Sequence, residues 1–236
     1  MKAMIFAAGK GTRLGKITEK TPKALLRING KSALQNAVEK VTAHGFDDII
    51  VNIHHHPHLM IEEINRLRSL GYRIEISDET ENLLETGGGL YNAKWFFDDN
   101  TPFLLYNVDI ITDLNLSDLY NFHKSHNAIA TLAVMKRNDT RYFLTGNDGI
   151  LRGWCNTETG EEIITGKEEP FYYKAAFTGI HVADPAIFSY MSDGVYSMTG
   201  LYLKISGEID VQTCIFECKW IDIGSEESLK AAGGDF

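Results

Sequence analysis

Met4-Ile5-Phe6-Ala7-Ala8-Gly9-Lys10-Gly11-Thr12-Arg13 stands near the start of the chain, and Thr21-Pro22-Lys23 follows it. An apolar run typical of a buried strand passes directly into a glycine-rich turn that carries cations. The first 31 residues hold eight Lys/Arg and one acid, a charge of +7, whereas the whole chain has a net charge of −9, so the remainder carries −16. This concentration of positive charge beside glycines predicts an anion-binding site rather than a solvated basic face.

Length and composition suit one large α/β domain or a domain with a small appendage, and we expect a single domain over residues 1–236. The chain has 236 residues, of which 44% are hydrophobic, and its net charge is negative. That charge argues against nucleic acid or an anionic membrane as the main partner. The three cysteines form no disulfide or zinc pattern, and no apolar stretch is long enough for a signal peptide or a membrane span. We therefore expect a cytoplasmic protein.

Strand-like and helix-like segments alternate along the first 135 residues. Short β-branched runs predict the strands, and apolar residues at helical spacing predict the helices, the first of them with Ser32 as its N-cap. The predicted strands are 4–8, 48–53, 73–77, 102–108 and 129–135, and the predicted helices are 32–44, 59–70, 88–97 and 116–126. This order predicts a mixed, mostly parallel sheet flanked by helices.

Beyond Asp139 the pattern changes to short strands and turns. Residues 177–182 predict a return to the sheet, and the segments 195–205 and 210–216 are interpreted as β-rich. No internal repeat or low-complexity linker separates this part from the first. We therefore expect one fold with two halves that bind different ligands.

The glycine-rich turn has the residue types that a phosphate group needs. Gly9 and Gly11 allow close approach of a ligand, and their N–H groups suit phosphate oxygens. Arg13 offers a planar fork of donors, and Lys23 offers a point charge on a segment that the preceding proline stiffens. Leu14 replaces the third glycine of the dinucleotide fingerprint, and no Gly-Lys-Ser/Thr sequence completes a P-loop. We therefore expect a different kind of phosphate cradle.

Asp109 and Asp222 each follow an apolar, strand-like run. Ligands of open α/β sheets bind beyond the carboxyl ends of the strands, so these carboxylates and the turn at 8–13 are expected to share one crevice. Mg²⁺ uses few carboxylates and completes its shell with phosphates and waters. The two aspartates are therefore the predicted Mg²⁺ ligands, although a single aspartate at such a place is more often a turn or cap residue.

A third glycine-rich element, Glu85-Thr86-Gly87-Gly88-Gly89, precedes the helix predicted at 88–97. The free N–H groups and the dipole at a helix start suit the polar edge of a ligand. Three consecutive glycines cost backbone entropy, which favours a closely approaching ligand over a plain helix start.

Together these motifs resemble those of the sugar-1-phosphate nucleotidyltransferases. The segments that carry the resemblance are 6–14, 21–25, 85–89, 107–109 and 220–224, in matching order and spacing along nearly the whole chain. Within the family the pattern is most similar to the N-acetylmuramate-1-phosphate uridylyltransferases, and the mannose-1-phosphate guanylyltransferases share much of it. The resemblance implies a Rossmann-like nucleotidyltransferase fold, with a nucleotide-binding half at about 1–135 and a sugar-phosphate-binding half at about 136–236.

The resemblance also implies a reaction. A sugar-1-phosphate oxygen attacks the α-phosphorus of a nucleoside triphosphate, most simply UTP with N-acetylmuramate-1-phosphate or a similar hexose-1-phosphate, and pyrophosphate leaves. It implies that Arg13 and Lys23 are catalytic, on the leaving and reacting phosphates, and that Asp109 and Asp222 hold Mg²⁺. The implied nucleotide-binding residues are Ala8, Gly9, Gly11, Thr12, Arg13, Lys23, Glu85, Thr86 and Gly87, and the implied sugar-phosphate residues are Asn107, Lys174 and Gly179.

Several alternatives stay open at this level. One is a mannose-1-phosphate guanylyltransferase that uses GTP, and another is a non-catalytic sensor of nucleotide-sugars, which the retained charged residues disfavour. A glycosyltransferase is disfavoured because Asp109 is followed by Ile110-Ile111 and not by a second aspartate two residues on. The His54-His55-His56-Pro57-His58 run is interpreted as an ordinary loop, since adjacent histidines cannot all face one ion. The base, the sugar and the oligomeric state are not determined.

Overall fold

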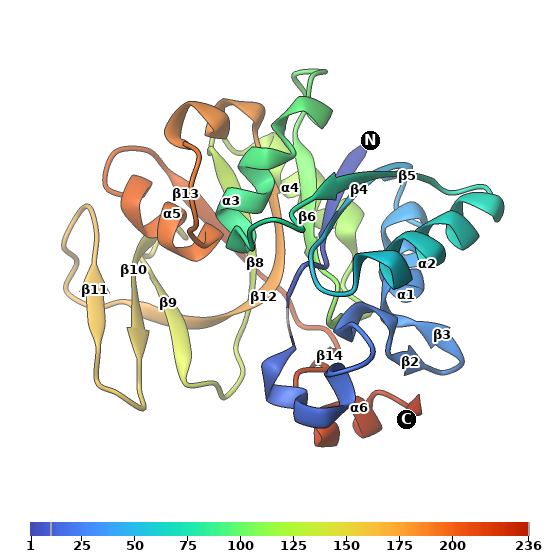
Figure 1. Cartoon of the computed structure of the whole chain (residues 1–236). Helices are drawn as coiled ribbons and strands as arrows, with labels where there is room; N and C mark the ends of the chain where they lie inside the picture. Colours follow the sequence, from blue (N-terminus) through green and yellow to red (C-terminus); the bar gives the residue numbers. More distant parts are fainter. Residues whose placement is uncertain (10, 236) are drawn as a thin grey trace.

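The fold is organised around a ten-stranded mixed sheet (Figure 1). The computed structural model describes residues 1–9 and 11–235. The strand order is β11-β10-β9-β12-β6-β1-β4-β5, with β8 beside β12 and β13 beside β8. The strands are β1 (Lys2–Phe6), β4 (Asp48–Ile53), β5 (Arg73–Asp78), β6 (Phe103–Asn107), β8 (Ala130–Met135), β9 (Arg141–Thr145), β10 (Leu151–Asn156), β11 (Glu162–Ile164), β12 (Tyr173–Ala183) and β13 (Val211–Ile215).

The pairing divides the sheet into two regions. Strand β1 pairs in parallel with β4 and β6, and β4 pairs in parallel with β5. The long strand β12 is antiparallel to β6, β8 and β9, and β9, β10 and β11 continue as an antiparallel meander. The predicted α/β class is therefore confirmed, with parallel pairing concentrated in the part of the sheet that carries the glycine-rich turn.

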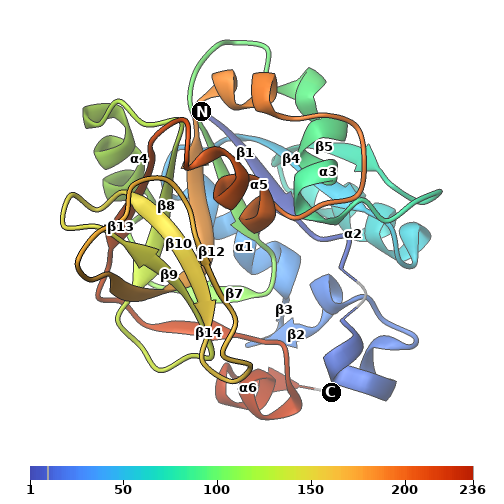
Figure 2. The ribbon, with the colours of Figure 1, turned by 90° about the vertical axis from the view of Figure 1, so that its left-hand side faces the viewer.

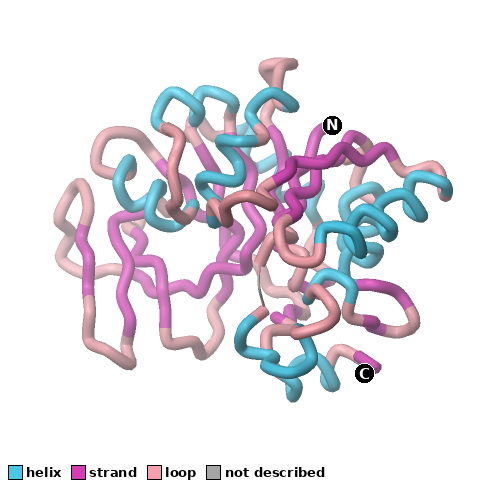
Figure 3. The backbone as a smooth tube through the Cα atoms, in the orientation of Figure 1, coloured by secondary structure: helices cyan, strands magenta, loops and turns pink. Residues whose placement is uncertain are grey.

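Helices cover both faces of the sheet (Figures 2 and 3). The α-helices are α1 (Ala33–Thr42), α2 (Pro57–Ser69), α3 (Glu85–Asn92), α4 (Leu116–Ser125), α5 (Met198–Ile205) and α6 (Glu226–Ala231), and the 3₁₀ helices are η1 (Thr12–Thr18), η2 (Lys23–Leu25), η3 (Lys94–Phe96) and η4 (Pro185–Tyr190). One hydrophobic core contains α1, α2 and α4, and the other contains α3 and α5. Strand β1 alternates between them, with Ala3 and Ile5 in the first core and Met4 and Phe6 in the second.

A third, smaller core joins the two ends of the chain. It contains Leu14 from η1, Ile28 from β2 (Arg27–Ile28), Ile223, and Leu229 from α6. Two small sheets accompany it: β14 (Trp220–Asp222) pairs with β7 (Ile110–Thr112), and β2 lies between β3 (Lys31–Ser32) and β15 (Gly234–Asp235). Figure 1 shows η1, in blue, beside the red C-terminal segment.

Most elements expected from the sequence are present with small differences in their ends, and Ser32 caps α1 by accepting a hydrogen bond from the Gln35 backbone N–H (2.9 Å). The β-rich interpretation of 195–205 is wrong, because Met198–Ile205 is α5. Its buried residues Met198, Leu201, Tyr202 and Ile205 recur at helical spacing. No helix among the described residues is long and apolar enough to cross a membrane.

Candidate active site

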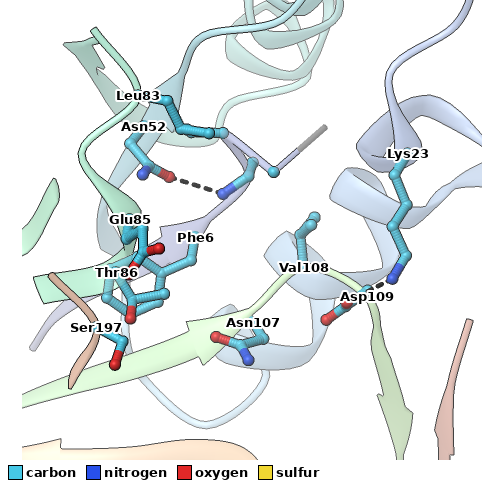
Figure 4. A pocket seen from close by; sticks show the side chains of 13 residues that line it. Phe6, Lys23, Asn52, Leu83, Glu85, Thr86, Asn107, Val108, Asp109 and Ser197 are labelled. Carbon is cyan, nitrogen blue, oxygen red and sulfur yellow. Dashed lines mark hydrogen bonds and ion pairs between the residues drawn. The ribbon is translucent and has the colours of Figure 1, made fainter. Parts of the chain in front are cut away.

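A cavity of about 340 Å³ lies where β1 and β6 end (Figure 4). Because Phe6 and Asn107 are paired in register, the chain leaves both strands at the same edge of the sheet. The segments that follow, 7–9 and 108–109, form one side of the cavity. Its lining residues are Phe6, Ala7, Ala8, Gly9, Lys23, Asn52, Leu83, Glu85, Thr86, Asn107, Val108, Asp109 and Ser197.

The start of α3 forms the facing wall through Glu85 and Thr86. This helix begins at Glu85, three residues before the predicted start at residue 88, so all three glycines lie inside it. A Cβ atom on Gly87 would lie 2.4 Å from the Tyr196 ring, and the Gly87 N–H donates to the Tyr196 carbonyl (2.8 Å). The structure therefore gives Gly87 and Gly88 a packing role against the 194–196 segment. The predicted contact of Gly87 with a nucleotide stays a prediction.

Four charged side chains gather beside the cavity: Lys23 and Asp109 line it, and Arg13 and Asp222 lie next to them outside the lining. The Lys23 ammonium Nζ lies 2.5 Å from Asp109 Oδ2 and 3.3 Å from Asp222 Oδ1, and the Arg13 guanidinium lies 3.2 Å from Asp222 Oδ2. The side chain of Lys23 is 10% exposed, whereas that of Arg13 is 70% exposed. The crevice expected from Arg13, Lys23, Asp109 and Asp222 thus exists in the structure, with one buried cation between two carboxylates.

The pairing that brings Asp222 beside Asp109 and Lys23 was not indicated by the sequence. Strand β14, which ends at Asp222, lies outside the large sheet and pairs with β7. The next residue, Ile223, donates its backbone N–H to the Asp109 carbonyl (3.0 Å). The third core then fixes this segment against η1, which carries Arg13. Two carboxylates 113 positions apart are therefore held together by a two-stranded ribbon, not by neighbouring strand ends of one sheet.

The remaining predicted residues differ in where they lie relative to the cavity. Gly11 has a left-handed φ of +64° and stands, like Thr12, at the start of η1 outside the cavity lining. Gly179 lies beside Asn107, because a Cβ at this glycine would come within 2.7 Å of the Asn107 amide. Lys174 is exposed in β12 and is not part of the lining. Lys10 lies outside the described residues.

The donor set fits a magnesium ion that arrives with phosphate groups. Among the described residues, no cluster of three or more His, Cys, Asp or Glu could hold a metal by itself. Asp109 and Asp222 supply two carboxylates, the number that Mg²⁺ usually takes from a protein when substrate phosphates and waters complete its shell. The histidine run makes other contacts, with His54 on the Glu79 carbonyl and His56 on the Glu19 carbonyl.

Sequence reasoning missed several cavity residues, among them Asn52, Leu83 and Ser197. It also missed Glu79, which is 3% exposed beside Asn52. Burial raises the pKa of the Glu79 carboxyl, although hydrogen bonds from Asn52 and Leu84 oppose the rise. One signal was available for Asn52: it is a lone amide inside the apolar run Ile49-Ile50-Val51, Ile53, where a polar side chain needs a buried partner.

Fold and site together define an α/β protein of the Rossmann-like class with a cation-lined crevice at the carboxyl ends of its parallel strands. The family described as "Nucleotidyl transferase" matches residues 2–235, and the chain belongs to this family.

Similar proteins support the assignment. The mannose-1-phosphate guanyltransferase of Yarrowia lipolytica is 35% identical over 97% of this chain and 62% of its own length. The N-acetylmuramate alpha-1-phosphate uridylyltransferase of Caulobacter vibrioides is 26% identical over 98% of this chain and 94% of its own length. Among solved structures, a putative glucose-1-phosphate thymidylyltransferase from Bacillus anthracis has a TM-score of 0.79 at 20% identity, covering 99% of this chain and 94% of that one. The chain spans 61–64% of the length of several curated relatives.

Proposed function

We propose that the chain joins a nucleoside triphosphate to a sugar-1-phosphate, giving a nucleotide-sugar and pyrophosphate. The observation that carries this proposal is the row formed by Arg13, Lys23, Asp109 and Asp222 beside a cavity lined by Ala8, Gly9 and Thr86. Two anionic substrates must meet in this reaction, so catalysis depends mainly on positioning and on stabilising charge. The site supplies cations, backbone N–H groups and a pair of carboxylates for that purpose.

Each group has a proposed role. Lys23 neutralises charge at the α-phosphate, and the exposed Arg13 binds the leaving phosphates. Asp109 and Asp222 would hold Mg²⁺, which offsets the charge of the phosphates when it is bound. The segment 7–9, with Gly11 and Thr12, and the start of α3 hold the nucleotide.

The acceptor is proposed to lie toward the second half of the chain. Asn107 lines the cavity and Gly179 packs beside it, which supports their assignment to the sugar phosphate. Lys174, which is exposed in β12, is proposed to reach the phosphate of the acceptor. The division into halves at about residue 135 is part of this proposal, and β12 joins both halves in one sheet by pairing with β6 and β8.

UTP with N-acetylmuramate-1-phosphate is the first substrate pair that we propose, in the cytoplasm, where nucleoside triphosphates are made. GTP with mannose-1-phosphate is the second, because the 35% identical relative is a mannose-1-phosphate guanyltransferase. The charged row supports catalysis over the non-catalytic sensor, since a sensor needs no cation for a leaving group.

A pyrophosphate-release assay tests the proposal. The purified protein is incubated with Mg²⁺, each of the four nucleoside triphosphates and a panel of sugar-1-phosphates. Release that requires both substrates is the expected result. Binding of a nucleotide-sugar without any release would identify a sensor. Transfer of sugar without consumption of a nucleoside triphosphate would identify a glycosyltransferase.

A further inference from the structure

A buried amide and a buried carboxylate connect the two walls of the cavity. Asn52 in β4 is 2% exposed, and Glu79, directly after β5, is 3% exposed. The Ala7 N–H donates to Asn52 Oδ1 (2.7 Å), and Asn52 Nδ2 donates to Glu79 Oε1 (2.8 Å). Glu79 Oε2 then accepts from the Leu84 N–H (3.3 Å). Ala7 lines the cavity, Leu84 lies between the lining residues Leu83 and Glu85, and Figure 4 shows Asn52 reaching the segment that follows β1.

These three hydrogen bonds form a buried row that runs from Ala7 through Asn52 and Glu79 to Leu84, separate from the charged row of the crevice. Donor and acceptor chemistry fixes the direction of each bond in it. The backbone N–H of Ala7 can only donate, so Asn52 must turn its oxygen toward it and its NH₂ group toward Glu79. Glu79 must then accept at one oxygen from Asn52 and at the other from the Leu84 N–H. A carboxylate provides both acceptors, whereas an amide of the same shape provides one acceptor and one donor.

The surroundings hold the carboxylate in place. A Cβ atom on Gly89 would lie 2.5 Å from Glu79 Oε1, so the glycine leaves the space that the carboxylate fills. The Glu79 backbone is fixed as well, since its N–H donates to the Ile53 carbonyl (2.9 Å) and His54 contacts its carbonyl (2.6 Å). A buried network in which every polar group has a hydrogen-bond partner makes the surrounding backbone rigid, although removing these groups from water costs free energy.

We propose that Asn52 and Glu79 are positioning residues for the nucleotide. They act through the backbone of Ala7 and Leu84, and thereby set the separation between the segment 7–9 and the start of α3. This inference rests on the proposed function, in which both walls hold the nucleoside triphosphate. The hydrogen bonds of the row involve neither Asn107 nor Gly179, the predicted sugar-phosphate residues, so we expect no direct effect on the acceptor.

Two substitutions of unchanged volume break the row. Glu79→Gln leaves one amide N–H facing another donor, and Asn52→Asp places a second carboxylate against Glu79. For each variant we expect the KM for the nucleoside triphosphate to rise about fivefold or more, the factor that corresponds to the smallest usual cost of an unsatisfied buried group. We expect the KM for the sugar-1-phosphate to change by less than about twofold.

The double variant Asn52→Asp/Glu79→Gln reverses only the central hydrogen bond, between positions 52 and 79, and satisfies every group of the row again. The carboxylate at position 52 accepts from the Ala7 N–H and from the amide at position 79, and the oxygen of that amide accepts from the Leu84 N–H. We expect its nucleotide KM to return to within about threefold of the wild-type value. Glu81→Gln, an exposed change in the same loop, is the matched control and is expected to leave both constants unchanged.

The experiment measures both KM values, kcat, the melting temperature, and calorimetric binding of each of the four nucleoside triphosphates for all five proteins. The inference is overturned if the single variants raise both KM values equally, if they leave the nucleotide KM unchanged, or if the double variant is no better than they are. If the wild-type protein binds a nucleoside triphosphate but releases no pyrophosphate, the proposed function alone is contradicted, because the effect of the variants on nucleotide affinity still tests the row. A wild-type protein that binds none of the four overturns both.

Discussion

Arg13, Asp222, Lys23 and Asp109 alternate in charge, so each carboxylate of the crevice has a cation beside it before any substrate enters. Phosphate oxygens would take over the cations, and a metal ion would take over the carboxylates. This exchange of partners avoids exposing a bare buried charge at any stage. Two variants, one that removes a negative charge and one that removes a positive charge, test these roles separately.

Asp109→Asn removes one negative charge without changing the volume of the side chain. We expect pyrophosphate release to fall about 100- to 1,000-fold, because a charge contact made in the transition state is typically worth about 3–4 kcal/mol. Asp47→Asn, exposed before β4 at the opposite edge of the sheet, is the control. Turnover of the Asp109 variant at the wild-type rate would exclude the metal-binding role.

Lys23→Met removes the cation that separates the two carboxylates and keeps the length of the side chain. We expect Mn²⁺, measured by electron paramagnetic resonance without nucleotide, to bind about tenfold or more tightly than to the wild type, because the metal no longer competes with an ammonium. The exposed Lys20→Met variant should bind Mn²⁺ as the wild type does. Equal affinities in all three proteins would contradict the proposed competition.

At the scale of elements, two segments show what the sequence could and could not indicate. Ser197 caps α5 by accepting a hydrogen bond from the Gly200 N–H (3.1 Å), a signal that the sequence contains but that the β-rich interpretation of 195–205 did not use. The ribbon of β7 and β14 gave no such signal, because pairing between segments 110 residues apart leaves no local pattern. The predicted convergence of Asp109 and Asp222 was right, but its predicted cause was not.

Contact between β12 and α5 makes stability depend on pH. The His181 ring nitrogen Nδ1 lies 2.6 Å from the Tyr202 hydroxyl, and burial lowers the pKa of His181 to about 3. Below about pH 6.5 the unfolded chain binds a proton at this residue that the folded chain does not. The free energy of unfolding should therefore fall with decreasing pH between about 6.5 and 3, by about 1 kcal/mol per pH unit from this site.

Urea unfolding at pH 6.5 and pH 5.0 measures this dependence. His181→Gln should show a smaller loss between the two pH values than the wild type, whatever its absolute stability. His58→Gln, which changes an exposed histidine, should keep the wild-type loss. A His181 variant with an unchanged pH dependence would show that the buried imidazole is not responsible.

At the scale of the whole molecule, the parallel half was predictable and the order of the sheet was not. Alternating apolar runs and helices identified β1, β4, β5 and β6 with nearly correct ends. The central position of β12, which pairs with β6, β8 and β9, depends on long-range packing that no local run encodes. The third core, built from Leu14, Ile28, Ile223 and Leu229, is long-range in the same sense.

Leu229→Ala tests how far this third core stabilises the fold. Leu229 is fully buried in α6, so the substitution should lower the free energy of unfolding by about 2–5 kcal/mol. Leu70→Ala, at a residue 57% exposed, should change it by about 0.5 kcal/mol or less. Denaturant titration followed by tryptophan fluorescence compares them. Equal effects of the two substitutions would show that the third core adds little to stability.

The charged row cannot form on the ribosome until Asp222 has been synthesised, because Asp222 is one of its members. A nascent chain that has emerged only as far as β13 has every strand of the large sheet, yet Lys23 then has one carboxylate partner and Arg13 has none from this row. The complete charged row therefore forms only after every strand of the large sheet has been synthesised.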